Sequence, residues 1–507
     1  MSIKAKENKT IAKNTLFLYI KLFVSTIIGL YTSRLVLDIL GVSDFGLYTV
    51  VGGLAIIMNF LGGVLTSTSY RFIAVELGKK DGNPNNIYNT VLIVHYTIAL
   101  LLLIIGESIG MYYIEHYLNI ETSKIDDATF ILHWAILSTT ATIISIPSSG
   151  LIIAKEKFLY TSIIEIVRNF IRLGLIIYLS YYSGNVLRMY SIINFIFMSI
   201  IPISSIIYCK IKFKDITKFK FNKKWNDYKN VIIFAGWSTF GAGSLVALNQ
   251  GNAIILNFFL STAINAAYGL ANQINGYVMM FVKNIGQAAV PQIMKQYSAG
   301  NSKESIKIVY NIAKFSFFFI LFPSIPCLIC MDRILELWLV NVPQYTALFA
   351  SLVILSNFFW CISVGFDSTI QASGNIKYYQ IFFSIINLSM LPLNYFLLKK
   401  NIPPYYIILN TVLANFFIWI LQIYFLYRMQ ILKLKEYLHI TIVPCFKVLL
   451  LVSPLFLISN IYAIKNFLDI CIITSINVIY IFVAEFFGGI SKKNRIEIIN
   501  NLKRKWK

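Results

Sequence analysis

The chain has 507 residues, of which 57% are hydrophobic and only 13% are charged. A soluble domain usually carries about 25% charged residues, and long apolar runs recur here along the whole sequence, so the composition excludes a soluble globular protein. The formal net charge of +22 points to an anionic partner, which could be nucleic acid or the surface of an anionic membrane.

Polar breaks divide the sequence into fourteen apolar segments, each long enough to cross a bilayer core roughly 30 Å thick. Because lipid offers the backbone no hydrogen bonds, we expect helices; barrel strands would be shorter and would alternate in polarity. The sequence therefore predicts an all-α polytopic membrane protein with about 14 transmembrane helices. The expected spans are 11–37, 45–66, 89–111, 129–153, 158–180, 186–209, 231–259, 262–288, 307–330, 345–370, 377–398, 402–427, 438–461 and 465–489.

The start of the chain does not have the pattern of a cleavable signal peptide. Its first ten residues are polar, and the apolar stretch that follows is too long and leads directly into a second span. We therefore expect the first span to remain in the protein as a transmembrane helix.

Lysine and arginine are spread unevenly over the connections between the spans. The N-terminus is placed in the cytoplasm, and a residue in the first three positions of a span is counted with the connection before it. Of the 44 Lys and Arg residues, 31 then fall in cytoplasmic segments, 6 in outer loops and 7 inside spans. Cytoplasmic segments of membrane proteins carry an excess of these residues. We therefore expect both termini to be cytoplasmic.

The most basic connection reads KIKFKDITKFKFNKKWNDYK, at 210–229. Its charge is compatible with nucleic-acid binding, but a cytoplasmic loop that contacts anionic lipid is the preferred interpretation. We therefore expect no nucleic-acid partner. This connection follows six spans, which makes it a natural joint between two halves. The expected organisation is an N-lobe at 1–209, a basic linker at 210–230, a C-lobe at 231–427, and two further helices with a basic tail at 428–507.

An internal repeat supports this division. At a constant offset of 220 residues, Tyr48 corresponds to Tyr268 and Asp81 to Asn301, and in each half an apolar span leads to a short amphipathic stretch and a turn. Two repeats of six helices have the same membrane orientation and are related by an axis along the membrane normal, which is a known transporter design.

Several charged residues lie deep within the predicted spans. Glu165, Arg168 and Arg172 are spaced i, i+3 and i+4 in an apolar helix and therefore share one face; Lys21 and Lys314 are also deep. One alternative is a structural Glu–Arg pair that leaves Arg172 without a partner. The other, which we favour, is a cationic cavity for an anionic ligand, because intramembrane charges usually face a bundle interior or a wet cavity and arginine binds phosphate bidentately.

Uncharged amides are unusually frequent in the spans 231–259 and 262–288. They can hold helices together or line a cavity, where amides suit sugar hydroxyls, and we favour the second interpretation. The candidate lining residues are Asn249, Gln250, Asn272 and Gln273.

The sequence shows no catalytic constellation. It has no long outer loop with paired acids and bases, no phosphate-binding loop, and four histidines without ligand spacing. Cys327 and Cys330 form a C-x-x-C, but packing is preferred over a redox or metal site because the sequence has no second C-x-x-C and no histidine nearby. We therefore expect no enzyme activity, no cofactor and no metal.

With these features, the chain resembles the MOP exporter superfamily, and within it the polysaccharide-transporter branch of Wzx-type flippases. The resemblance rests on NTLFLYIKLFVSTIIGLYTSRLVLDILGVSDFGLYTVV at 14–51, on YRFIAVELGKKDGN at 70–83 and on its counterpart VPQIMKQYSAGN at 290–301. It covers essentially the whole chain through the helix count and loop plan.

The resemblance implies a MATE-like fold with two six-helix lobes around a central cavity, two extra C-terminal helices and alternating access. It also implies a bacterial inner-membrane protein that flips undecaprenyl-diphosphate-linked oligosaccharides for O-antigen, capsule or exopolysaccharide. A proton or Na⁺ gradient could drive transport, with Glu165 as the coupling residue, and a polysaccharide polymerase is a possible partner. A lipid II flippase, a multidrug or cation antiporter of the same superfamily and, as another class, an enzyme of polysaccharide assembly stay open as alternatives.

Overall fold

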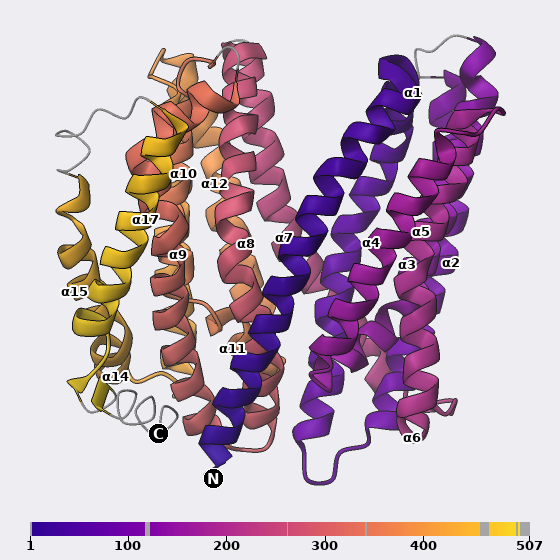
Figure 1. Ribbon diagram of the computed structural model, residues 1–507. Coiled ribbons are helices and arrows are strands. Elements are labelled where there is room, and N and C mark those ends of the chain that lie inside the picture. The colour runs from indigo at the N-terminus through magenta and orange to yellow at the C-terminus, as the bar shows by residue number, and fades with distance from the viewer. Residues whose placement is uncertain are drawn as a thin grey trace, which may run out of the picture. The chain divides into compact units, whose positions relative to one another are not determined.

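The computed structural model describes residues 3–116, 122–260, 262–339, 342–456, 466–492 and 495–496, and every regular element in these ranges is a helix (Figure 1). Eight of the described helices are long and apolar enough to cross a membrane, and a ninth span results if the bent pair α10 and α11 counts as one. The predicted all-helical, multi-pass membrane protein is thus confirmed.

The first half of the chain begins with a helix that is broken in the middle. Within α1, Gly41 has φ 71° and ψ 171°, a backbone conformation that favours glycine and interrupts the helix. The two parts of α1 correspond to the first two expected spans. The elements of this half are α1 (Ile3–Gly78), α2 (Pro84–His116), η1 (Thr122–Lys124), α3 (Ile125–Ala154), α4 (Phe158–Leu179), α5 (Val186–Lys212) and α6 (Lys214–Thr217).

The second half contains a second break. Helices α10 and α11 meet at an angle of 48°, and Gly365 before α11 has φ 93°. The elements of this half are α7 (Trp225–Phe259), α8 (Thr262–Ser298), α9 (Ser302–Trp338), α10 (Thr346–Cys361), α11 (Phe366–Ser373), α12 (Lys377–Lys399), α13 (Tyr405–Arg428), α14 (Leu434–Tyr437), the π-helical turn η2 (Leu438–Ile442), α15 (Val443–Val452), α17 (Phe467–Ala484) and the π-helical turn η3 (Glu485–Gly489).

The helices form two compact units. Unit 1 comprises Met1–Thr239 and Met294–Gly300, and unit 2 comprises Phe240–Ile293 and Asn301–Lys507. Helix α7 therefore begins in unit 1 and continues in unit 2, and the last residues of α8 belong to unit 1. The division of the chain into transport lobes at 1–209 and 231–427 stays a prediction.

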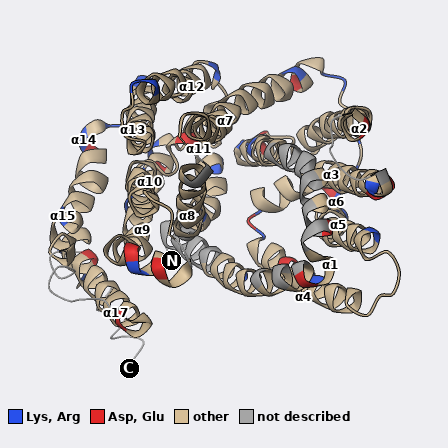
Figure 2. Ribbon diagram, turned by 90° about the horizontal axis from the view of Figure 1, so that it is seen from above, with Lys and Arg blue, Asp and Glu red and all other residues tan. Residues whose placement is uncertain are grey.

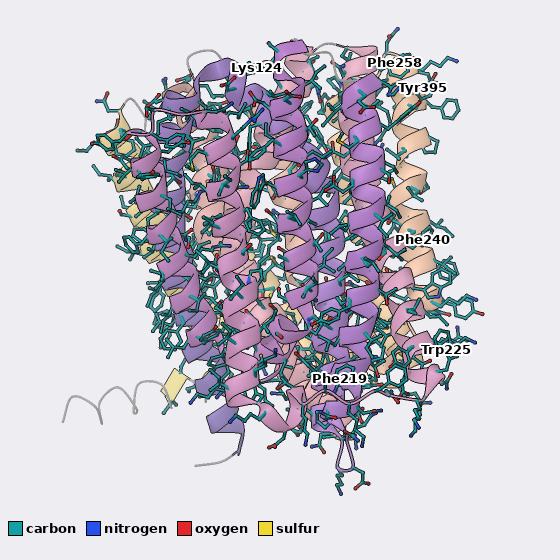
Figure 3. The ribbon with its side chains drawn as sticks, turned by 90° about the vertical axis from the view of Figure 1, so that its right-hand side faces the viewer. Lys124, Phe219, Trp225, Phe240, Phe258 and Tyr395 are labelled. Atoms are coloured by element: carbon teal, nitrogen blue, oxygen red, sulfur yellow. The ribbon has the colours of Figure 1, made fainter. Side chains whose placement is uncertain are left out.

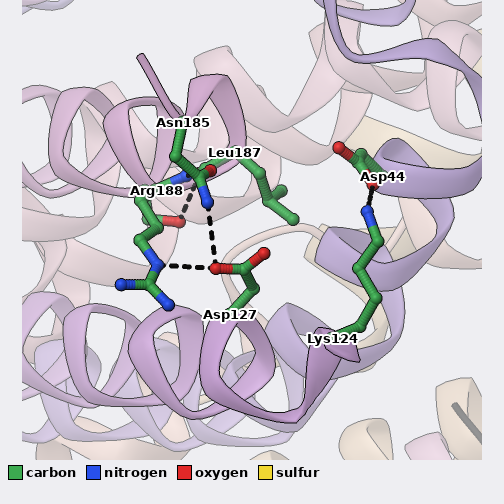
Figure 4. Close-up of polar contacts among 7 residues, drawn as sticks. Asp44, Lys124, Asp127, Asn185, Leu187 and Arg188 are labelled. Atoms are coloured by element: carbon green, nitrogen blue, oxygen red, sulfur yellow. Dashed lines mark hydrogen bonds and ion pairs between the residues drawn. The ribbon is translucent and has the colours of Figure 1, made fainter. Parts of the chain in front are cut away.

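In unit 1, α3 is the central helix and packs against α1, α2 and α5. Polar contacts fasten one end of this bundle (Figure 4). Arg188 Nε and Asn185 Nδ2 both donate to Asp127 Oδ1, at 2.5 and 3.1 Å, and join α5 to α3. Lys124 pairs with Asp44 and joins η1 to α1. The two basic residues at this end are thus neutralised by acids.

In unit 2, α9 packs against α10, α15 and α17, and α13 packs against α10 and α12. Buried amides hold three of its helices together. Asn394 Nδ2 donates to Asn252 Oδ1 at 2.8 Å, and Asn410 Nδ2 donates to Asn394 Oδ1 at 2.6 Å. This chain of amides joins α7, α12 and α13 inside the unit.

The helix bounds repeat with the offset that the sequence shows. Adding 220 to the bounds of α3, α4 and α5 gives 345–374, 378–399 and 406–432, which coincide closely with the α10–α11 pair, α12 and α13. The same offset places the end of α1 at the end of α8. The two halves are therefore built on one helical plan, as the repeat predicted.

Charged residues are sparse along the helices of each unit, as the largely tan ribbon in Figure 2 shows. The cytoplasmic location of both termini stays a prediction.

Two single cysteines, in a chain without its six native ones, test the orientation. Lys223 and Tyr181 are exposed at connections that the charge bias places inside and outside, respectively. We expect an impermeant maleimide added to intact cells to label Tyr181→Cys and to leave Lys223→Cys unlabelled until the cells are permeabilised. The reverse labelling would contradict the orientation.

Candidate functional site

The three charged residues of α4 lie halfway along that helix. Helix α4 has 22 residues, from Phe158 to Leu179, so Arg168 is about 15 Å from either end at a rise of 1.5 Å per residue. Glu165 precedes it by three residues and Arg172 follows it by four, and all three side chains are partly buried. The predicted common face therefore lies near the middle of α4. That α4 crosses the membrane stays a prediction, because it is not among the eight described helices that are long and apolar enough.

Glu165 connects α4 to α1. Its carboxylate lies 3.1 Å from Lys21 Nζ and 3.9 Å from an Arg168 guanidinium nitrogen. The exposed fractions of the Lys21, Glu165 and Arg168 side chains are 18%, 26% and 17%. The main ion pair of Glu165 is therefore with Lys21, and its contact with Arg168 is longer. The sequence alone suggests a Glu165–Arg168 pair instead.

A second contact between the same helices lies one turn further along. Asn169 Nδ2 donates to Ser25 Oγ at 2.7 Å. From the Lys21–Glu165 pair to the Ser25–Asn169 pair, the residue number rises by four on both helices. This part of α1 therefore runs parallel to α4. Their relative register is therefore fixed by two polar contacts.

Both arginines of α4 lie against one aromatic ring of α5. The guanidinium carbon is 4.3 Å from the Phe197 ring centroid for Arg168 and 4.5 Å for Arg172, and Phe197 itself is buried. A cation over an aromatic ring gains about 0.5–2 kcal/mol, depending on solvent exposure. Phe197 thus holds two like charges close together where repulsion would separate them.

Tyr48 on α1 adds a hydroxyl group near Arg172. Its side chain interacts electrostatically with Arg172, accepts a hydrogen bond from Asn194 Nδ2 at 2.5 Å and packs edge-on against Tyr190. The sequence marked Tyr48 only as a position of the repeat, and nothing in it marked Asn194 or Phe197 as part of a site. Only the packing of α5 against α1 and α4 identifies them.

We call Lys21, Glu165, Arg168 and Arg172, together with Phe197, the cationic cluster. Three basic groups and one acid leave it with a formal charge of +2. Arg168 Nε is buried and makes no hydrogen bond to the described residues. A buried donor without a partner is uncommon in proteins and commonly marks the place of a water molecule or an ion. The cluster can therefore accept an anion that supplies the missing charge and acceptor.

The equivalent positions in the second repeat are uncharged. At the offset of 220, Lys21 corresponds to Gly241, Glu165 to Ile385, Arg168 to Leu388 and Arg172 to Pro392. The same helical plan is thus built in the second half without a single charge at these places. This argues that the fold does not require the cationic cluster.

Lys314, also predicted to bind substrate, lies in unit 2. It is buried on α9, with its ammonium 5.0 Å from the Phe315 ring centroid and in electrostatic contact with Cys445. None of the residues of the cationic cluster belongs to this unit. A substrate role for Lys314 stays a prediction.

The predicted amides fall into two groups. Asn249, Gln250 and Gln273 are exposed, and Asn272 is half-buried. A buried amide bonds another helix instead, since Asn357 Nδ2 of α10 donates to Asn275 Oδ1 of α8 at 2.6 Å. The four candidate lining residues are therefore outside the amide chain of α7, α12 and α13. Two of them bond tyrosines of their own helix, since Asn272 hydrogen-bonds Tyr268 and Gln273 Nε2 donates to the Tyr277 hydroxyl at 3.5 Å. Their role in lining a cavity stays a prediction.

Other chemistry finds little support in the described part of the chain. It holds no group of three or more His, Cys, Asp or Glu side chains that could bind a metal ion. The six cysteines are free thiols, five of them buried or half-buried.

The Lys21–Glu165 pair gives a stability prediction. We expect Glu165→Gln to lower the free energy of unfolding by about 1–3 kcal/mol, because it leaves two partly buried cations without their acid. In the double variant Lys21→Met, Glu165→Gln, part of this loss should be recovered. Thermal unfolding of the purified variants in detergent measures the coupling. Strictly additive effects of the two substitutions would contradict a direct interaction.

No family model matches the sequence, and no curated protein matches it. Solved structures do match. A MATE transporter in complex with MaL6 superposes with a TM-score of 0.70 at 12% identity, over 84% of this chain and 96% of that one. An outward-facing multidrug resistance MATE family transporter of the MOP superfamily gives 0.69 at 13% identity, with the same coverage.

A further match is a MOP superfamily transporter from Pyrococcus furiosus, with a TM-score of 0.69 at 12% identity, over 84% of this chain and 96% of that one. That protein is described as having a binding pocket of reversed polarity, which suggests a different function for it. At these identities the likeness concerns the fold. The chain is a multi-pass membrane protein with the fold of MATE transporters of the MOP superfamily.

Proposed function

We propose that the protein is a transporter that flips undecaprenyl-diphosphate-linked oligosaccharide repeat units across the bacterial inner membrane by alternating access. The units would serve the synthesis of a surface polysaccharide, namely O-antigen, capsule or exopolysaccharide. The observation that carries this proposal is the cationic cluster in the middle of α4, where Arg168 and Arg172 share Phe197 and a single acid is present.

A diphosphate matches the cluster in charge and in geometry. Each guanidinium group can donate two parallel hydrogen bonds to phosphate oxygens, and charge-assisted bonds of this kind are about twice as strong as neutral ones. Because Phe197 orders both guanidinium groups, less side-chain freedom is lost when the diphosphate binds. Arg168 Nε, which lacks a hydrogen-bond partner among the described residues, is a ready donor.

The rest of the cargo would be held by different chemistry. Sugar hydroxyls suit the amide side chains of Asn249, Gln250, Asn272 and Gln273, while the polyprenyl chain needs no polar contact and stays in the bilayer. Lys314 would add a further positive charge in unit 2. Fixed positive charge is thus the proposed contact for the diphosphate, and neutral hydrogen-bonding groups are the proposed contact for the glycan.

Glu165 is the proposed coupling residue for a proton or Na⁺ gradient. It lies between Lys21 and Arg168, so protonation or Na⁺ binding at its carboxylate would weaken its hold on both bases. The bases would then be more available to the anionic cargo. A ligand shifts a conformational equilibrium only by its differential affinity for the two states. Here the bases would exchange the Glu165 carboxylate for the diphosphate, and this exchange would make the affinity for the cargo depend on the bound proton or Na⁺. A polysaccharide polymerase is a proposed downstream partner.

Three alternative functions use the same fold or the same cargo chemistry. A lipid II flippase carries the same diphosphate, so the cationic cluster supports it equally. An antiporter for cationic drugs would need acids in its site, and the cluster is mainly basic. An enzyme of polysaccharide assembly would need a constellation of catalytic groups, which the sequence does not show. The Pyrococcus furiosus transporter is an example of this fold with altered pocket polarity.

Deletion of the gene separates transport from enzymatic synthesis. We expect the cells to lose surface polysaccharide while undecaprenyl-diphosphate-linked repeat units persist on the cytoplasmic side, because their synthesis precedes flipping. Extraction and mass spectrometry of the lipid-linked units provide the measurement. If the units were never made, the protein would act earlier, as an enzyme; if peptidoglycan precursors accumulated instead, lipid II would be the cargo.

Substitution of Arg172 tests the cationic cluster itself. We expect Arg172→Gln to abolish transport at normal membrane abundance, and Arg172→Lys to keep part of it, because a point charge attracts phosphate without bidentate geometry. Arg333→Gln is the matched control, since Arg333 is exposed and pairs with Glu336.

The readout is surface polysaccharide divided by the amount of protein in the membrane. Full activity of Arg172→Gln would remove Arg172 from the substrate site. Because Lys21 lies closer to Glu165 than Arg168 does, Arg168→Gln should leave Glu165 paired and protein levels unchanged. Transport alone should fall in that variant.

A further inference from the structure

The connection at 210–225, between α5 and α7 of unit 1, carries a dense row of unpaired lysines. All of them are exposed, and none forms an ion pair with the described residues. Such a concentration of charge repels itself and needs counter-anions from outside the chain. We call this connection the basic platform. Its lysines are Lys210, Lys212, Lys214, Lys218, Lys220, Lys223 and Lys224.

Three aromatic side chains alternate with these lysines and are also exposed. The exposed fractions of Phe219, Phe221 and Trp225 are 65%, 61% and 72%. Figure 3 shows Phe219 and Trp225 near the end of unit 1 that lies opposite Lys124. Large aromatic rings are enriched where a membrane meets water, so the platform has both components of an interfacial surface.

The backbone of the platform is held in place by α2. Asn85 Nδ2 donates to the carbonyl oxygens of Asp215, Ile216 and Lys218, at 3.1, 2.9 and 2.7 Å, and thereby caps the short helix α6. Asn89 Nδ2 donates to the same Lys218 oxygen at 3.0 Å. The lysines and aromatic rings are therefore displayed from an ordered support.

The end of the platform is fixed by a buried asparagine. Asn222 Nδ2 donates to Thr90 Oγ1 at 2.8 Å and to Asp227 Oδ2 at 2.7 Å. The backbone carbonyl of Asn222 accepts a hydrogen bond from the Tyr228 hydroxyl at 3.0 Å. Asn86 Nδ2 also donates to Asp227 at 3.3 Å. Asp227 is thus engaged by amides, and Asp215, the acid within the platform, forms no ion pair with the described residues. The lysines therefore remain available to external anions.

We propose that the basic platform docks onto anionic phospholipid headgroups of the adjacent leaflet, with Phe219, Phe221 and Trp225 inserted at the interface. The platform joins the ends of two apolar helices, α5 and α7, so a leaflet surface is always within its reach. Its charge complements that surface, and its rings suit the headgroup region. This inference does not depend on the proposed cargo.

The lipid preference can be measured without any transport. Purified full-length protein in mixed micelles of phosphatidylcholine and phosphatidylglycerol is analysed by native mass spectrometry, which counts bound lipids. We expect Lys218→Gln, Lys220→Gln and Lys223→Gln together to weaken phosphatidylglycerol binding by about fivefold per lysine at low salt.

A second triple variant is the matched control. Lys79, Lys307 and Lys433 each pair with an acid three residues away, so their joint replacement by Gln should change the lipid preference less than about twofold. An equal loss in both triple variants, or no loss in either, would overturn the proposal.

The aromatic part is tested by fluorescence. Quenching by brominated phosphatidylglycerol in nanodiscs, compared with the Trp225→Phe variant, reports the depth of Trp225. We expect strong quenching that falls in Asn85→Ala, which keeps every lysine but releases the backbone support. If acrylamide in water reached Trp225 equally with and without phosphatidylglycerol, the proposal would fail. Tighter binding of short RNA or polyphosphate than of phosphatidylglycerol vesicles would assign the platform to a soluble polyanion instead.

Discussion

A charged side chain inside a bilayer has to find a partner within the protein, and the cationic cluster depends on this constraint. An unpaired charge at the centre of a spanning helix costs roughly 2.5–3.5 kcal/mol on insertion scales. Unit 1 places three basic residues and one acid in that environment and offsets part of the cost with the Glu165 carboxylate and the Phe197 ring. The remaining positive charge is not balanced by the cluster itself.

The same constraint explains the contrast between the two halves. The second repeat uses the equivalent helices with Gly, Ile, Leu and Pro where unit 1 has its charges, and it fastens α7, α12 and α13 with neutral amides. An amide pair satisfies its hydrogen bonds without an ion's desolvation cost. One helical plan thus carries charges at these positions in unit 1 and none at the equivalent positions in unit 2.

Charged residues at the ends of the helices of unit 1 are paired differently from those in the middle of α4. At one end of unit 1, Lys124 and Arg188 are each matched by an acid, whereas the lysines of the basic platform form no ion pair with the described residues. Water screens such charges and makes them inexpensive, so their concentration on one connection is not a requirement of folding. The amides of Asn85 and Asn89 hold that connection in a defined shape, which a merely solvated loop would not need.

The sequence by itself determined the helical class, the repeat offset and the common face of Glu165, Arg168 and Arg172. These follow from short-range rules, because lipid forces apolar segments into helices and helical spacing aligns residues three and four apart. The partners were decided only by tertiary structure. Lys21, Phe197 and Tyr48 come from helices far apart in sequence, and helix packing, which hydropathy does not encode, brings them to α4. Helix packing also decides that Glu165 pairs more closely with Lys21 than with Arg168. It decides in the same way which amides join α7, α12 and α13.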